Sequence, residues 1–234
     1  MFKMITDTNI EKYRYDTIYT KEPETIAWID SFEDDGIFVD IGANVGVYSL
    51  YCASRHDAIQ VYAFEPLHKN FMALCENIEI NFFNTIVPVL MSLSDYEGES
   101  IIIPKDEETG TTAYLEKYEN IKKYAKYDIT KTMKLDNFHL FGFRIDNVKY
   151  IKIDVDGCED TVLRGMDRIL LNGNVESLLI ETVNVERIKL LMYWYGYEID
   201  QTHKHTPNHS DVRRIANGIP ERNIIFKRRE TINE

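Results

Sequence analysis

Short apolar runs alternate with helical periodicity along most of the chain. Runs rich in β-branched and aromatic residues predict strands, whereas apolar positions three and four apart predict amphipathic helices. Strands are expected from Ile37 and over residues 59–64, 86–93, 148–154, 177–183, 197–201 and 223–227. Helices are expected over residues 22–32, 47–55, 67–81, 159–171 and 185–195. This alternation predicts an α/β fold with a mostly parallel sheet, in which the last two strands pair antiparallel.

Two stretches depart from this alternation. Residues 99–104 predict an added strand, paired as a hairpin through the turn near Gly98. Residues 105–143 mix threonine, tyrosine and lysine without a clean period, and we interpret them as a lid or a substrate-recognition insertion. Residues 1–35 are expected to form a helical cap segment, and we expect residues 1–234 to fold as a single domain.

The segment at residues 37–46 carries the most informative chemistry. An apolar strand leads into Asp40, and Gly42 and Gly46 form a tight loop before a helix. In open α/β folds such a loop lies at the carboxyl edge of the sheet, where ligands bind. A pyrophosphate would be repelled by Asp40, and the G-x-x-x-x-G-K-[ST] phosphate loop is absent. Asp40 suits a cationic cofactor, and S-adenosylmethionine (SAM) carries both an ammonium and a sulfonium.

Charge and composition narrow the expected partners. The formal net charge of −12 is unfavourable for non-specific contact with nucleic acid or anionic lipid. Charges interrupt residues 1–33, unlike a signal peptide, and no apolar run approaches the roughly 20 residues that span a bilayer. We expect a soluble cytoplasmic protein with no nucleic-acid partner and no membrane span, and a homo-oligomer is left open. Its cysteines, Cys52, Cys75 and Cys158, are expected to be buried thiols in a reducing compartment.

Three motifs together resemble the FkbM family of SAM-dependent methyltransferases. They are the loop at residues 39–46, the tripeptide Phe64-Glu65-Pro66 and residues 152–157, which occur in the family's order with similar spacing. The resemblance implies a Rossmann-like class I methyltransferase fold. This fold has a seven-stranded, mostly parallel sheet with an antiparallel last strand and helices on both faces. Asp156 departs from the family pattern, in which glutamate is common at this position.

The resemblance and the strand ends together define an expected SAM site. Glu65 ends the second strand, where a carboxylate can accept hydrogen bonds from both ribose hydroxyls. Ser92 and Leu93 end the third strand, where class I methyltransferases usually place an adenine contact. The expected SAM-binding residues are Asp40, Gly42, Ala43, Asn44, Gly46, Tyr48, Glu65, Pro66, Ser92, Leu93 and Asp154.

The expected catalytic residues are Asp154, Asp156, His203 and His205. Asp154 ends the fourth strand beside the expected position of the transferable methyl group, and Asp156 follows in the turn. His203 and His205 belong to a loop after a late strand, where a histidine can act as a general base or lie in an exposed polar loop. Asp154 and Glu181 end neighbouring strands, so their carboxylates can hold Mg²⁺ or instead orient sugar hydroxyl groups.

Two further charged residues near this edge have structural interpretations as well. Lys152 points opposite to Ile151 and Ile153 along its strand, and a buried lysine needs a partner. We expect Lys152 to serve the structure as much as catalysis. Glu159 falls in the first turn of a helix, where a carboxylate often interacts favourably with the helix macrodipole.

The function expected from these residues is SAM-dependent O-methylation. The acceptor would be a hydroxyl group of a sugar, a glycan precursor or a secondary metabolite, deprotonated by Asp154 or a loop histidine. Two alternatives stay open. One is a SAM-binding module of the same fold without turnover. The other is an NAD-dependent oxidoreductase, against which Asp40 and the absence of the full G-x-G-x-x-G spacing argue.

Overall fold

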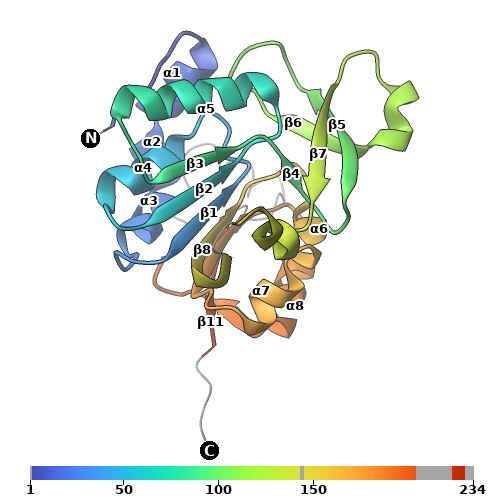
Figure 1. Ribbon diagram of the computed structural model, residues 1–234. Coiled ribbons are helices and arrows are strands. Elements are labelled where there is room, and N and C mark those ends of the chain that lie inside the picture. Colours follow the sequence, from blue (N-terminus) through green and yellow to red (C-terminus); the bar gives the residue numbers. More distant parts are fainter. Residues whose placement is uncertain (1, 143–144, 204–222, 230–234) are drawn as a thin grey trace, which may run out of the picture.

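A seven-stranded sheet forms the centre of the computed structural model, which describes residues 2–142, 145–203 and 223–229 (Figure 1). The sheet order is β10-β11-β9-β8-β1-β2-β3. In that order the strands are Tyr197–Ile199, Asn223–Arg228, Ser177–Glu181, Val148–Ile153, Ile37–Ile41, Gln60–Phe64 and Ile86–Val89. Strand β11 pairs antiparallel with both neighbours, and the other pairs in this sheet are parallel. The predicted fold is therefore confirmed, including its antiparallel last strand.

Helices cover both faces of this sheet, because the central strands are apolar on both sides. In β1, Phe38 packs into one core and Val39 and Ile41 into the other, and all five residues of the strand are buried. The core around Phe38 includes residues of α3 (Pro23–Asp30), α4 (Val47–Arg55) and α5 (His68–Asn81). The opposite core includes residues of α6 (Glu159–Arg164), α7 (Asp167–Asn172) and α8 (Val185–Trp194).

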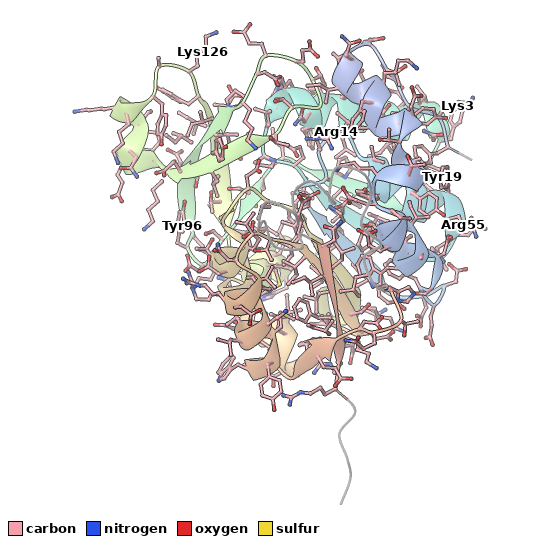
Figure 2. All side chains as sticks on the ribbon, turned by 180° about the vertical axis from the view of Figure 1, so that it is seen from behind. Lys3, Arg14, Tyr19, Arg55, Tyr96 and Lys126 are labelled. Atoms are coloured by element: carbon pink, nitrogen blue, oxygen red, sulfur yellow. The ribbon has the colours of Figure 1, made fainter. Side chains whose placement is uncertain are left out.

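Two short helices, α1 (Asn9–Asp16) and α2 (Ile18–Lys21), precede α3 at the amino terminus. Thr8 caps α1, since its hydroxyl accepts from the Glu11 amide while the Glu11 carboxylate accepts from the Thr8 amide. Seen from behind, Lys3 and Tyr19 mark this helical side of the molecule, and Arg14 lies nearer the middle (Figure 2).

A second sheet of four strands stands beside the first (Figure 1). Its order is β4-β7-β5-β6, with bounds Ser92–Leu93, Asp128–Met133, Gly98–Pro104 and Ala113–Lys117. The expected hairpin through Gly98 is wrong, because β5 pairs with β6 and β7 instead of the preceding strand. Strands β6 and β7 lie within residues 105–143, the stretch without a clean period. Most of their residues are only partly buried or exposed, so their sequence does not alternate between apolar and polar positions. The 3₁₀ helices are η1 (Tyr118–Lys123), η2 (Leu135–Phe141) and η3 (Ile145–Asn147).

Three further expectations need correction. The strand expected over 86–93 divides into β3 and β4, which belong to different sheets. The helix expected over 159–171 divides at Gly165, where an added Cβ would lie 2.0 Å from the carbonyl oxygen of Ser94. Cys52 is buried, but Cys75 and Cys158 are only half-buried, and all three are free thiols. Among the described helices, none has the length and apolarity needed to cross a membrane.

Candidate active site

A pocket opens at the carboxyl ends of β1, β2 and β8. It contains seven of the expected SAM-binding residues, namely Gly42, Asn44, Glu65, Pro66, Ser92, Leu93 and Asp154. The expected catalytic residue Asp156 also lines it. These residues therefore line one continuous pocket, at the sheet edge where open α/β folds bind ligands.

Gly42 brings the loop after β1 into close contact with β8. Its φ of 82° lies in the left-handed region, and its amide donates to the Phe64 carbonyl oxygen at 2.9 Å. A Cβ at this position would lie 2.0 Å from the carbonyl oxygen of Asp154. Only glycine fits there, and its missing side chain leaves backbone at the pocket wall for a cofactor to approach.

Glu65, the expected ribose ligand, has a carboxylate that is fixed by backbone amides. One carboxylate oxygen accepts from the Asn44 amide and the other from the Leu67 amide, both at 2.8 Å. These bonds fix the side chain and leave acceptor capacity on both oxygens for hydroxyl donors. The residue is 5% exposed, and burial raises the pKa of Glu65 to about 7 although the backbone bonds oppose the shift. The fixed carboxylate fits a ligand that donates two hydroxyl groups.

The remaining residues of the expected cofactor loop support the pocket without lining it. Asp40 is buried beneath the loop and accepts a hydrogen bond of 2.6 Å from the Ser49 hydroxyl. Burial raises the pKa of Asp40. The Ala43 amide donates to the Phe64 carbonyl oxygen at 3.0 Å, and a Cβ on Gly46 would lie 2.5 Å from a Leu74 methyl carbon. These three residues therefore hold the loop against the rest of the protein.

The segment at Gly110 and Thr111, which joins β5 to β6, forms a cover over the pocket. Asn70 and Arg14, which the sequence pattern did not single out, hold this segment in place. Asn70 in α5 is 1% exposed, accepts from the Gly110 amide at 2.8 Å and donates to the Thr111 carbonyl oxygen at 2.9 Å. Asn44 donates to the same Thr111 oxygen at 2.9 Å, and Arg14 donates to the Gly110 carbonyl oxygen at 3.0 Å. A buried asparagine within an apolar helical pattern was the signal available for Asn70.

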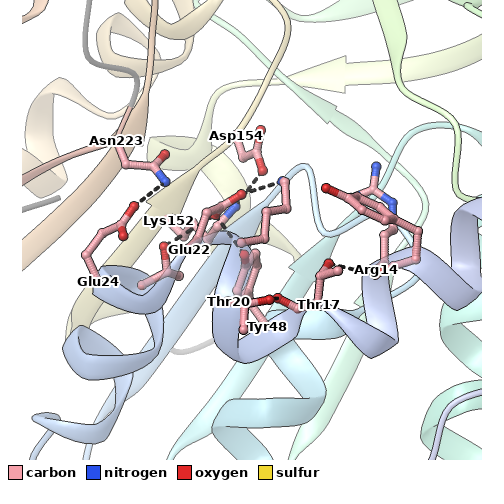
Figure 3. Close-up of polar contacts among 12 residues, drawn as sticks. Arg14, Thr17, Thr20, Glu22, Glu24, Tyr48, Lys152, Asp154 and Asn223 are labelled. Carbon is pink, nitrogen blue, oxygen red and sulfur yellow. Dashed lines mark hydrogen bonds and ion pairs between the residues drawn. The ribbon is translucent and has the colours of Figure 1, made fainter. Parts of the chain in front are cut away.

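A cluster of charged side chains adjoins the pocket at Asp154 (Figure 3). The Lys152 ammonium lies 2.8 Å from the Asp154 carboxylate and 4.8 Å from the centre of the Tyr48 ring. The Tyr48 hydroxyl donates to Glu22 at 2.7 Å, and Glu22 forms an ion pair with Lys21. The cluster thus connects β8 to the amino-terminal helices. Tyr48 belongs to this cluster and does not line the pocket.

Asp154 and Glu181 come together as expected, but with opposite shifts in pKa. Burial disfavours the charged form of Asp154, yet Lys152 and Lys21 outweigh it and hold the pKa of Asp154 well below its usual range. The charge of Asp154, followed by burial, raises the pKa of Glu181 to about 8. The two carboxyl groups therefore lie close enough to shift each other's pKa.

This carboxyl pair does not fit the expected Mg²⁺ site. The Lys152 ammonium lies 2.8 Å from Asp154, so this carboxylate already has a cationic partner. Across residues 2–142, 145–203 and 223–229 no group of three or more histidine, cysteine, aspartate or glutamate side chains could hold a metal ion. A hard divalent cation usually takes six or more oxygen ligands, some of them from water.

Of the remaining expected catalytic residues, Asp156 lines the pocket and His203 does not. Asp156 forms an ion pair of 3.1 Å with Lys105, which connects the turn after β8 to the end of β5. His203 follows β10, and its ring forms a hydrogen bond of 2.8 Å with the Asp200 carboxylate. It does not line the pocket. His205 lies outside the described residues. The Glu159 carboxylate accepts from the Gly157 amide at 2.8 Å and serves the start of α6.

The chain is similar to several known proteins. The model of the family described as "Methyltransferase FkbM domain" matches residues 40–215. "Methyltransferase 1" of Beauveria bassiana is 27% identical over 150 residues, which cover 58% of this chain and 60% of the relative. "Hexuronic acid methyltransferase AglP" of Haloferax volcanii is 27% identical over 146 residues, which cover 62% of this chain and 56% of the relative. The matched region thus spans less than two thirds of these relatives.

Among solved structures, the chain is similar to a precorrin-6y C5,15-methyltransferase from Geobacter metallireducens. The alignment covers 98% of this chain and 94% of the other, with 10% sequence identity and a TM-score of 0.49.

Proposed function

Because the chain belongs to the FkbM methyltransferase family, we propose that it is a SAM-dependent O-methyltransferase. The observation that carries the proposal is the position of two carboxylates in one pocket. Glu65, fixed by two backbone amides, and Asp154, at the end of β8, both line this pocket. The first fits the ribose of a nucleoside, and the second marks the place where an acceptor hydroxyl would meet the reactive end.

The residues of the pocket divide the work of binding and orientation. SAM, when bound, supplies a methyl group on a sulfonium, which is also the leaving group. Glu65 accepts the ribose hydroxyls, and the backbone at Gly42 forms the wall along which the cofactor lies. Ser92 and Leu93 line the pocket at the start of the second sheet, where the adenine would bind. The protein's main tasks are then to position the acceptor and to remove its proton.

We place the acceptor among small hydroxylated molecules of the carbohydrate type. A relative with 27% identity carries the name hexuronic acid methyltransferase, which supports a sugar-derived acceptor. The net charge of −12 disfavours a polyanionic acceptor.

Calorimetric titration with SAM tests the cofactor assignment. We expect SAM binding by the wild type, no binding of NAD in a parallel titration, and weaker SAM binding by Glu65→Gln. The variant Glu176→Gln, which changes a carboxylate at the opposite end of β9, should bind SAM like the wild type. Absence of SAM binding by the wild type would refute the proposal, and binding of NAD would favour an oxidoreductase.

Transfer of labelled methyl groups tests turnover and acceptor class. The panel should contain neutral sugars, uronic acids and hydroxylated secondary metabolites. We expect product with at least one member, and loss of product with Asp154→Asn at unchanged SAM affinity. A wild type that binds SAM but methylates no member would favour a binding module without turnover.

A further inference from the structure

Glu181 ends β9, the strand next to β8, and β8 leads directly into Asp154, which lines the pocket. We propose that Glu181 accepts the proton released by the acceptor hydroxyl, while Asp154 and Lys152 position it and set its charge. This proposal rests on the proposed O-methyltransferase function. Glu181 then has the role of general base that was expected of Asp154. Asp154 and Lys152 hold Glu181 in position instead.

Strand pairing brings the two carboxyl groups together. Strands β8 and β9 are parallel neighbours, with Ile153 paired to Ile180, so Asp154 and Glu181 follow side by side at the carboxyl edge. Each carboxyl group shifts the pKa of the other, as two neighbouring carboxyl groups do. Asp154 is 32% exposed and lines the pocket, so the pair adjoins the place where the acceptor would bind.

The surroundings decide which carboxyl group keeps its negative charge. Lys152, 1% exposed, holds Asp154 at 2.8 Å and is itself held by the ring of Tyr48. Asp154 therefore stays ionised, as its lowered pKa indicates, and makes a poor proton acceptor. The titrating member of the pair is Glu181.

Charges around Glu181 tune it for this role. Asp154 and Glu22 raise its pKa, Lys21 lowers it, and burial adds to the rise. A general base works best when its pKa lies near the working pH, and the pKa of Glu181 is raised to about 8. Glu22 and Lys21 come from the α2–α3 junction, outside the matched residues 40–215, so the amino-terminal segment takes part in setting this base.

The proposed step balances as follows. The acceptor oxygen forms a bond to the methyl carbon while the carbon–sulfur bond breaks, and the electron pair of that bond stays on sulfur. The O–H bond of the acceptor breaks, and its proton passes to the ionised Glu181 carboxylate. The enzyme thus gains one proton, which returns to solvent before the next turnover. No oxidant, reductant or metal is needed.

Carbon NMR of protein labelled at the glutamate carboxyl carbon tests the titration of Glu181 without an acceptor. We expect one glutamate signal to titrate near pH 8, to disappear in Glu181→Gln and to titrate below pH 7 in Asp154→Asn, which lacks the neighbouring charge. Glu198→Gln, an exposed glutamate of β10, should keep the signal. No glutamate signal titrating above pH 7 in the wild type, or its persistence in Glu181→Gln, would overturn the proposal.

Methyl transfer separates this proposal from the proposed function. With an acceptor found, Glu181→Gln should bind SAM within about threefold of the wild type but transfer methyl groups on the order of 10²–10⁴-fold more slowly. The rate of the wild type should rise with pH up to about 8, and this rise should vanish in the variant. An active wild type with a fully active Glu181→Gln would overturn the base assignment alone. A wild type that methylates nothing would overturn both.

Discussion

Asp40 and Lys152 occupy paired positions on the central parallel strands β1 and β8, and each residue is only 1% exposed. Burial alone would lower the pKa of Lys152, but the carboxylates of Asp154, Asp40 and Glu22 outweigh it and raise the pKa. One buried ammonium therefore balances carboxylates from the cofactor loop, the end of β8 and the amino-terminal helices. The stability of the sheet and the geometry of the site depend on the same cation.

Removing this cation should destabilise the protein strongly. We expect Lys152→Met to lower the free energy of unfolding by about 3–5 kcal/mol at pH 8, because the buried carboxylates lose their partner. Urea denaturation measures the change. The control is Lys12→Met, which breaks an exposed ion pair with Asp16 and should cost less than about 0.5 kcal/mol. Equal losses in the two variants would contradict the role assigned to Lys152.

SAM affinity should depend on pH through Glu65. The ribose hydroxyls donate to the ionised carboxylate, and burial raises the pKa of Glu65 to about 7. We therefore expect affinity to be about tenfold weaker at pH 6 than at pH 8, measured by calorimetry. Glu65→Gln should bind weakly at both values. A wild-type affinity that does not change over this range would show that the ionised carboxylate does not contact the cofactor.

The Glu65 carboxyl group should also make the stability of the free protein depend on pH. Stability should fall over the pH range in which SAM affinity rises. The folded protein holds the Glu65 proton at higher pH than the unfolded chain does, because the pKa is raised from 4.5 to about 7. The free energy of unfolding should therefore fall by about 1–3 kcal/mol as the pH rises through this window, before other groups are counted. Glu65→Gln should lack this part of the pH dependence in urea denaturation of the free protein.

Gly42 offers a test of the pocket wall with a matched control. Gly42→Ala places a Cβ 2.0 Å from the Asp154 carbonyl oxygen, whereas Gly157, with a similar φ of 88°, has no atom within 4 Å of that position. Both variants carry backbone strain of about 1–3 kcal/mol. Gly42→Ala should cost about 1–3 kcal/mol more and lose SAM affinity, because the loop must move away from β8. Similar stability and affinity in the two variants would contradict this contact.

Local signals explain why much of the fold and the cofactor pocket could be predicted. Strands β1 and β2 are short apolar runs buried on both faces, and each is followed at once by a polar residue or turn. Because parallel strands bring their carboxyl ends to one edge, the sequence predicts that Gly42, Glu65 and Asp154 lie close together. Their positions depend on neighbours within a few residues.

Contacts between distant segments could not be predicted in the same way. The approach of Glu22 to Tyr48, and through it to Lys152, depends on how α3 packs against α4. Asp40 was expected to meet the cofactor, yet it shares a face of β1 with Phe38 and turns toward Ser49 in α4. The alternation of side chains along β1 indicates that Asp40 faces the same core as Phe38. The prediction that Asp40 contacts the cofactor rested instead on its position before a glycine loop.

The cover over the pocket provides the last prediction. Asn70→Ala removes two hydrogen bonds to the backbone of Gly110 and Thr111 and leaves the Gly110 amide without its partner. We expect a loss of about 1–3 kcal/mol and faster hydrogen exchange at Gly110, because an unsatisfied buried amide favours local opening. SAM should also dissociate faster, since the cover then holds the pocket less firmly. Asn120→Ala, which removes a side-chain bond to Glu116 on the second sheet, should change neither quantity. Unchanged exchange at Gly110 in Asn70→Ala would show that the remaining contacts, including those of Asn44 and Arg14, hold this segment without Asn70.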